Sequence, residues 1–444
     1  MQCKLHFNPK WITGELIKQM KLSKLALVAA IACGTYAGNV FADQTNDIQL
    51  VSCESNCDCG EPVCGCEPAC DDACDAGCDS GCDSAGCGLG LGSCGIGSCL
   101  DCGDCCLGDP YTLFGECHGI TAGGWMQLGY FTNPTINFNK YSDKVQLQQG
   151  WLFAEKAIDA SCGFDIGGRI DYVYGTDGPD TQAFGNPQGT YDFQEGWTNG
   201  SQYGSALPQL YLEAGYGDLS VKVGHFYTII GYEVVQATGN FFYSHANTMY
   251  NSEPFTHTGV LFTLDHSDDV TLYGGYVQGY DSGFEDNGDA FLGGVSLGLT
   301  DRLNVTYAAI GGRLNEAGNG GGPFAVTENG YMHSVVATYD VSCDVQYIMQ
   351  SDYLDTNVRE SIGVNNYLIK TINDCTGVGA RFEWWNTTPV AGGTSFDTYN
   401  LTFGVNHRQC ANLTWRPEIR YDWYDGFDGN EDSFKFAVDA VMTF

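Results

Sequence analysis

The last twelve residues, Ser433 to Phe444, are SFKFAVDAVMTF. Every even-numbered position from Phe434 to Phe444 is apolar, whereas the odd-numbered positions include Ser433, Lys435, Asp439 and Thr443. A period of two is typical of a β-strand that has an apolar environment on one face and a polar one on the other. The stretch therefore predicts a strand that lies between two unlike environments and ends the chain.

The same alternation recurs upstream, for example in residues 163–174, 398–406 and 411–423. Most of these segments have about 10 to 14 residues, and a tilted membrane-spanning strand needs roughly 9 to 11. We expect about 16 strands. They begin near residues 119, 145, 163, 208, 218, 256, 268, 288, 302, 330, 343, 362, 375, 396, 411 and 432.

The expected connections alternate in length. The links after the even-numbered strands are short, as in 217–218, 300–301 and 373–374, whereas those after strands 3, 5 and 9 are long. Short turns at one rim and long loops at the other are typical of bacterial outer-membrane barrels, and a soluble β-sandwich has no reason to sort its loops. Such a sheet must close, because lipid leaves the backbone of an open edge unpaired. We predict an all-β fold, a transmembrane antiparallel up-and-down β-barrel preceded by a Cys-rich segment.

Residues 1–42 resemble an export signal. Lys18, Lys21 and Lys24 precede an apolar run, and the small residues before Asp43 include a plausible cleavage site at Ala42. The alternative is a lipoprotein signal with its cysteine at Cys33.

Residues 43–117 hold 16 of the 22 cysteines, many acidic residues and no lysine or arginine. Such a segment cannot bury an apolar core, so it needs cross-links or metal to hold a shape. Disulfides suit an exported setting best. Metal binding and a reduced, disordered spacer remain as alternatives, and the spacing does not match a zinc pattern. We expect this to be a periplasmic segment, followed by the barrel at 118–444.

The chain is strongly acidic, with 54 Asp and Glu against 19 Lys and Arg, a formal charge of −35. This balance excludes nucleic acid as a partner, since phosphate binding needs a basic surface. From residue 118 onward the net charge is −24, which favours cations at the pore mouths. The sequence has no Gly-x-Ser-x-Gly, phosphate-loop or His-Glu-x-x-His motif, so we expect no catalytic residue, cofactor or metal centre.

Several motifs resemble the OmpL-like β-barrel porin family of planctomycete bacteria. They are Gly224-His225-Phe226-Tyr227, Glu253-Pro254-Phe255-Thr256-His257, Gly379-Ala380-Arg381-Phe382-Glu383-Trp384 and Arg416-Pro417-Glu418-Ile419-Arg420. The resemblance covers about residues 119–444. It implies a porin-like barrel in the outer membrane, names no solute and does not extend to the Cys-rich segment. The terminal Phe444 also resembles the signal that barrel-assembly machinery recognises.

Eight charged residues are expected to line the pore, because charge on the lipid face costs roughly 2–4 kcal/mol for Arg or Lys at the midplane. Opposed charges in a pore tune ion passage. The alternative is that these residues only pair across strands to hold the barrel. Pro417, which lies among them, predicts a local bulge because it lacks a ladder donor. The eight residues are Arg169, Asp171, Arg381, Glu383, Arg416, Glu418, Arg420 and Asp422.

The link from Thr228 to Phe255 is the third connection on the long-loop side. Loops of this length usually have a function, and its few charges and many aromatic residues favour a packed loop. We expect it to fold inward as a constriction, with an outward lid and an oligomer contact as alternatives. Its candidate residues are Glu233, Asn240, Tyr243 and Glu253.

Four cysteines, Cys162, Cys343, Cys375 and Cys410, fall in or beside the short turns and are disulfide candidates. If the short turns are periplasmic, these cysteines share a rim with the end of the Cys-rich segment. We therefore hypothesise that disulfides join this segment to the rim or to an envelope partner. The alternative is two disulfides within the rim.

Together these features predict an outer-membrane porin that passes small hydrophilic solutes or ions, contacts outer-membrane lipid and forms a homo-oligomer. The competing function is a non-conducting structural barrel that anchors a cross-linked Cys-rich segment. A third alternative is a soluble, exported metal-binding protein.

Overall fold

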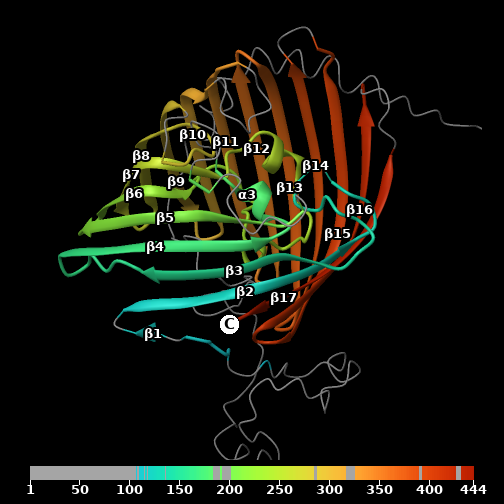
Figure 1. Ribbon diagram of the computed structural model, residues 1–444, viewed down its shortest axis with the longest axis horizontal. Helices are drawn as coiled ribbons and strands as arrows, with labels where there is room; N and C mark the ends of the chain where they lie inside the picture. The colour runs from blue at the N-terminus through green and yellow to red at the C-terminus, as the bar shows by residue number, and fades with distance from the viewer. Residues whose placement is uncertain are drawn as a thin grey trace, which may run out of the picture.

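The computed structural model describes residues 119–444 except 136, 184–190, 193–201, 285–287, 317–325, 390–392 and 427–431, together with 107, 110–114 and 116–117. The expected signal segment and almost all of the Cys-rich segment lie outside these residues. Within the described residues, one sheet of seventeen strands curls into a barrel (Figure 1). The two-residue strand β1 pairs only with β2, and the sixteen strands β2–β17 form the wall.

Each wall strand pairs in antiparallel fashion with its neighbours in the sequence. The predicted starts agree with the observed ones to within four residues. The strands are β1 (Glu116–Cys117), β2 (Ile120–Phe131), β3 (Gln146–Lys156), β4 (Phe164–Gly175), β5 (Gly204–Tyr216), β6 (Leu219–Tyr227), β7 (Thr256–Ser267), β8 (Val270–Val277), β9 (Asp289–Thr300), β10 (Leu303–Asn315), β11 (Glu328–Ser342), β12 (Val345–Thr356), β13 (Arg359–Asn373), β14 (Thr376–Pro389), β15 (Phe396–Cys410), β16 (Leu413–Asp425) and β17 (Ser433–Thr443).

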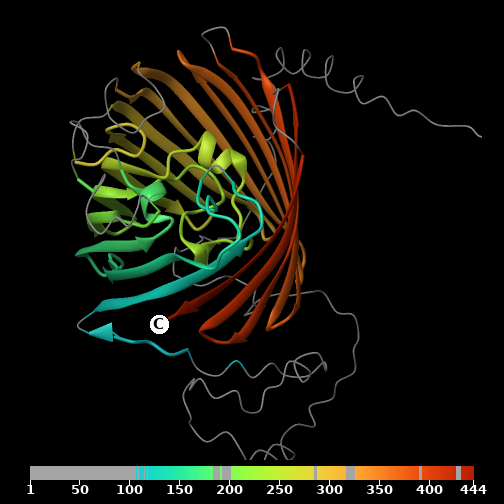
Figure 2. The same cartoon turned by 45° about the vertical axis from the view of Figure 1, so that its right-hand side comes forward.

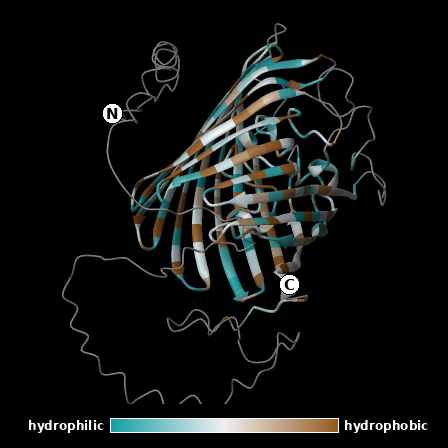
Figure 3. Ribbon diagram, turned by 90° about the vertical axis from the view of Figure 1, so that its left-hand side faces the viewer, coloured by the Kyte–Doolittle hydropathy of each residue, from teal (hydrophilic) through white to brown (hydrophobic). Residues whose placement is uncertain are grey.

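The alternation read from the sequence sorts side chains between the outside and the bore. Phe164, Leu212, Phe291 and Phe434 point outward with 58 to 68% of their surface exposed. Hydropathy alternates along the strands accordingly (Figure 3). Exposed apolar side chains around a closed barrel match a lipid-facing belt.

The barrel closes where the sequence predicted, between the last strand and the first long one. β17 pairs with β2, with Met442 opposite Met126. Beyond the last pair, the backbone of Phe444 exchanges two hydrogen bonds of 2.9 Å with Gly124. A Cβ on Gly124 would lie 3.0 Å from the Phe444 ring, so glycine leaves room for the terminal aromatic residue.

The expected bulge at Pro417 is absent. Gly404 pairs with Glu418 and His407 with Trp415, in one unbroken register, and the two intervening residue pairs simply lack ladder bonds. Proline removes a donor without adding a residue, and a register shift would turn the apolar face of β16 into the bore.

Three short helices lie in connections at the long-loop rim: α3 (Gly178–Thr181), η1 (Ala237–Gly239) and α4 (Asn247–Asn251). Among the described residues no helix has the length and apolar character needed to cross a membrane. The segment 228–255, which carries η1 and α4, lies inside the barrel outline (Figure 2). We call it the lumen loop.

Candidate functional site

The lumen loop leaves the wall between β6 and β7 and crosses the bore to the opposite side. In a ring of sixteen strands, β14 is eight strands from β6 and therefore faces it. Loop backbone and side-chain groups contact β14 and β16 through hydrogen bonds that join residues more than 130 positions apart. The lumen loop therefore lies in the bore and contacts the wall opposite β6.

Local contacts shape the loop before it meets the wall. The side chain of Asn240 accepts from the amide of Val234 at 2.9 Å and donates to the carbonyl of Gln236 at 2.9 Å, closing a turn around η1. Gly231 has φ +90°, a left-handed conformation that glycine adopts without strain. These two residues bend the chain into the bore.

Arg381 on β14 forms an ion pair with Glu233 of the loop at 2.7 Å, and both side chains are buried. Arg381 also donates to the hydroxyl of Ser244 at 3.0 Å. Burial alone would raise the pKa of Glu233, but Arg381 and then His245 lower this pKa to about 2. Glu233 is therefore an anion held by the opposite wall.

Two wall carboxylates accept hydrogen bonds from the loop backbone. Glu418 accepts from the amides of Tyr243 and Ser244 at 3.0 and 3.2 Å. Glu383 accepts from the amides of Asn247 and Thr248, at 2.8 and 2.7 Å. Because Asn247 and Thr248 begin α4, Glu383 supplies acceptors for amides that have no partner within the helix.

Two wall arginines bind loop carbonyl oxygens. Arg416 donates to the carbonyls of Ala237 and Asn240, each at 2.7 Å, and Arg420 donates to the carbonyl of His245 at 2.6 Å. Both guanidinium groups are about 1% exposed. The row of charges predicted on β16 therefore faces inward and is covered by the loop.

The remaining predicted residues divide into two places. Asp422 pairs with Arg420 on the same strand at 2.6 Å. Arg169 and Asp171 on β4 pair with each other at 2.7 Å, and Arg169 also pairs with Glu155 at 2.8 Å. Arg169 and Asp171 face inward on the wall, and among the described residues they have no hydrogen bond to the lumen loop.

Lys435 and Asp439 on β17 also belong to the charged wall. Asp439 pairs with Arg416 and Lys435 pairs with Asp422. The alternating pattern of the final strand already placed both residues on its polar face. Their partners followed only from the register, in which Arg416 lies opposite Asp439 and Arg420 opposite Lys435.

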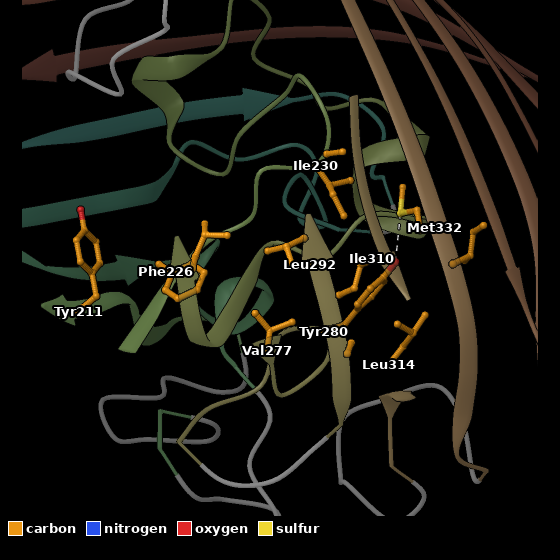
Figure 4. Packing of buried hydrophobic residues seen from close by; sticks show 13 residues of the cluster. Tyr211, Phe226, Ile230, Val277, Tyr280, Leu292, Ile310, Leu314 and Met332 are labelled. Carbon is orange, nitrogen blue, oxygen red and sulfur yellow. Dashed lines mark hydrogen bonds between the residues drawn. The ribbon is translucent and has the colours of Figure 1, made fainter. Parts of the chain in front are cut away.

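A row of apolar side chains lines part of the bore on β9 to β12. Leu292, Ile310, Met332 and Leu354 lie directly opposite one another along β9 to β12 and form a row across the inner wall. Ile230 of the lumen loop belongs to the same buried cluster (Figure 4). The loop is therefore held by packing on one side and by charge on the other.

The four candidate cysteines lie at the short-turn rim, as predicted. Cys375 is buried there, with 4% of its surface exposed. Near it, the amide of Ala411 donates to the carbonyl of Leu107 at 2.9 Å, and the side chain of Asn412 binds the backbone of Tyr111. Leu107 and Tyr111, which precede the barrel, therefore lie against this rim.

These observations define a class, that of sixteen-stranded barrels with an apolar outer belt and a long loop folded into the bore. The family model "Putative beta-barrel porin-2, OmpL-like" matches residues 119–444, and the chain belongs to this family. The family resemblance noted in the motifs is thus confirmed, and the protein is a barrel of the bacterial outer membrane.

Two solved structures share the fold. OmpF of Salmonella typhi, in complex with daunomycin, is 12% identical with a TM-score of 0.53, over 73% of this chain and 97% of that chain. A loop L8 deletion mutant of OmpT, an outer-membrane protein of Vibrio cholerae, is 14% identical with a TM-score of 0.50, over 73% and 99%. At such identities the similarity concerns the fold alone. No curated protein matches this chain.

Proposed function

We propose that the barrel is a passive, non-enzymatic channel for small hydrophilic solutes or ions, and that the lumen loop is its constriction. The observation that carries this proposal is the attachment of the loop to the opposite wall by Arg381, Glu383, Arg416, Glu418 and Arg420. A loop fixed at both walls narrows the bore by a constant amount, whereas an unattached loop would close it intermittently.

The charged residues on β14 and β16 affect the passage of ions indirectly, because they hold the lumen loop in place. Because the wall arginines are covered, the ions that pass meet the remaining lining, and the acidic balance of the barrel favours cations. We propose that Glu233, Asn240, Tyr243 and Glu253 set the width of the aperture. The same proposal includes contact with outer-membrane lipid and association into a homo-oligomer, which native mass spectrometry of the detergent-solubilised protein tests.

Deletion of residues 236–247 tests the constriction. The deletion removes the turn at Asn240 and the bonds to Arg416 and Glu418, so single-channel conductance of the purified barrel should rise severalfold. Heat-modifiable migration on a gel provides the control that the variant still forms a barrel. A fall in conductance, or no change in a folded variant, contradicts the proposal.

A second candidate function is a structural barrel that anchors the Cys-rich segment. It is favoured by the place of Cys375 at the short-turn rim and by the bonds from Leu107 and Tyr111 to the neighbouring turn. Peptide mapping without reduction should yield a Cys375 peptide joined to one from residues 53–117, and Cys375→Ser should release it. If that joined peptide is present and the wild-type barrel does not conduct, anchoring is the function. A Cys375 peptide joined to another rim turn contradicts the tether.

A further inference from the structure

Near the end of the lumen loop that leads into β7, Arg359 on β13 donates to the carbonyl of Asn251, but the carboxyl group of Glu253 is bound without a cation. Glu253 of the loop lies beside Asp352 on β12, because both carboxyl groups bind the same nitrogen atom. Gln350, also on β12, donates to Glu253 at 2.6 Å and to Asp352 at 2.7 Å, so one amide group binds both carboxyl groups. Glu253 is 7% exposed and Asp352 is 1% exposed.

The arginines in this part of the bore pair with other acids. Arg359 pairs with Glu328 at 3.2 Å and Arg381 pairs with Glu233 at 2.7 Å. Within the described part of the chain, neither Glu253 nor Asp352 forms an ion pair, and Oδ1 of Asp352 has no hydrogen-bond donor. The cluster therefore contains two acids that share one neutral amide donor.

Two buried carboxylates in contact cannot both be ionised at low cost, because each charge loses its hydration and repels the other. Such pairs share one proton, and the proton belongs to the pair rather than to either residue. Burial first, and then Asp352, raises the pKa of Glu253 well above its usual value. The contact between loop and wall thus needs a proton that a solvent-exposed glutamate would already have lost.

We propose that one proton shared between Glu253 and Asp352 holds this end of the lumen loop on β12, and that the end detaches as pH rises. The acidic pair is a pH-controlled latch within the channel. This inference goes beyond the conduction proposed above, because it concerns the attachment of the loop and holds for a conducting or a closed barrel.

The groups around the pair set the direction of the effect. Glu233 of the loop and Glu383 on β14 add negative potential, and Ser334 on β11 faces Asp352. Asp281, which binds the amides of Phe255 and Thr256, has its pKa raised by burial to about 6 and is ionised above neutral pH. Burial also raises the pKa of Tyr280 well above its usual value, so this side chain stays neutral.

The direction in which docking depends on pH follows from these pKa shifts. A carboxyl group whose pKa is raised in the docked state stabilises docking while it is protonated, and this contribution is lost as pH rises through the raised pKa. The ratio of detached to docked loop grows by about tenfold per pH unit between the ordinary pKa of an exposed glutamate and the raised pKa of the docked pair, and it levels off above the raised pKa.

Hydrogen–deuterium exchange of the full-length barrel in detergent micelles tests the latch, with peptides from residues 248–255 compared at about pH 7 and about pH 10. Glu253→Gln is the matched variant, because its amide donates to Asp352 at every pH. Comparison of variants at equal pH cancels the intrinsic acceleration of exchange. We expect equal protection at neutral pH and, at alkaline pH, exchange at least tenfold faster in the wild type.

Asp352→Asn should likewise keep its protection at alkaline pH. It serves as the test variant if Glu253→Gln does not fold, as judged by heat-modifiable migration. Equal exchange in wild type and variants at alkaline pH would overturn the latch. The latch would also be overturned if Glu253→Gln lost as much protection at alkaline pH as the wild type does. Because exchange does not require conduction, failure of the latch and failure of the proposed channel are distinguishable.

Discussion

Replacement of Arg381 by Met removes the guanidinium that faces Glu233 but keeps an unbranched chain of similar length. Glu233 then remains buried, with 5% of its side chain exposed and without the cation that lowers its pKa from 4.5 to about 2. A shift of that size corresponds to about 3 kcal/mol at neutral pH. Removal of one partner from a buried ion pair costs a similar amount, about 3 to 5 kcal/mol.

A loss of about 3 kcal/mol multiplies the population of undocked loop by on the order of 100. The amides that depend on the docked geometry are those of Ala246, bound to Glu233, and Thr248, bound to Glu383. Hydrogen–deuterium exchange at these positions should accelerate by about that factor, and single-channel recordings should show higher or noisier conductance.

The double variant Arg381→Met with Glu233→Gln is the matched control, because it leaves no buried charge unpaired and should recover much of the lost protection. Acid provides a second test. The pair stabilises docking above the ordinary pKa of glutamate and loses its effect as pH falls through about 2, so the wild-type loop should loosen there. The reasoning is refuted if Arg381→Met leaves exchange and conductance unchanged.

Two further predictions concern the wall. Arg416→Ala combined with Arg420→Ala removes two positive charges and three bonds to loop carbonyls, so conductance should rise and the reversal potential should shift toward greater cation preference; an unchanged reversal potential argues against any influence of these arginines on selectivity. Gly363→Val should displace α4, because a Cβ at this glycine would lie 2.4 Å from Oγ1 of Thr248; protection of the α4 amides should fall, and wild-type exchange in this variant would contradict the close packing.

Much of the wall follows from the sequence because two environments act on alternate residues. In a barrel the lipid fixes which face is apolar, so the period of two in residues 433–444 reports orientation directly. For the same reason the arginines of β14 and β16 could be placed inside the bore. The alternation of short and long connections then predicted the rim at which each turn lies. The start of β5 was placed four residues late, where a long connection joins the strand without a clear change of pattern.

The partners within the bore could not be predicted in the same way. The row from Leu292 to Leu354 is apolar on the inner face as well, which the expectation of a polar bore did not include. Such residues face inward because the loop covers them with Ile230. The sequence did not single out Gln350 and Asp352, since their importance depends on where the side chain of Glu253 lies in the folded barrel. These contacts join elements more than 90 positions apart, and no local pattern encodes them.

The lumen loop also has a mechanical consequence. It is covalently continuous with β6 and β7 and is hydrogen-bonded to β14 and β16 on the facing side, so it braces the tube along one diameter. A thin cylinder flattens most easily by ovalising, and a strut across its width opposes that deformation in both compression and tension. The lumen loop therefore keeps the cross-section round against lateral pressure from the surrounding membrane.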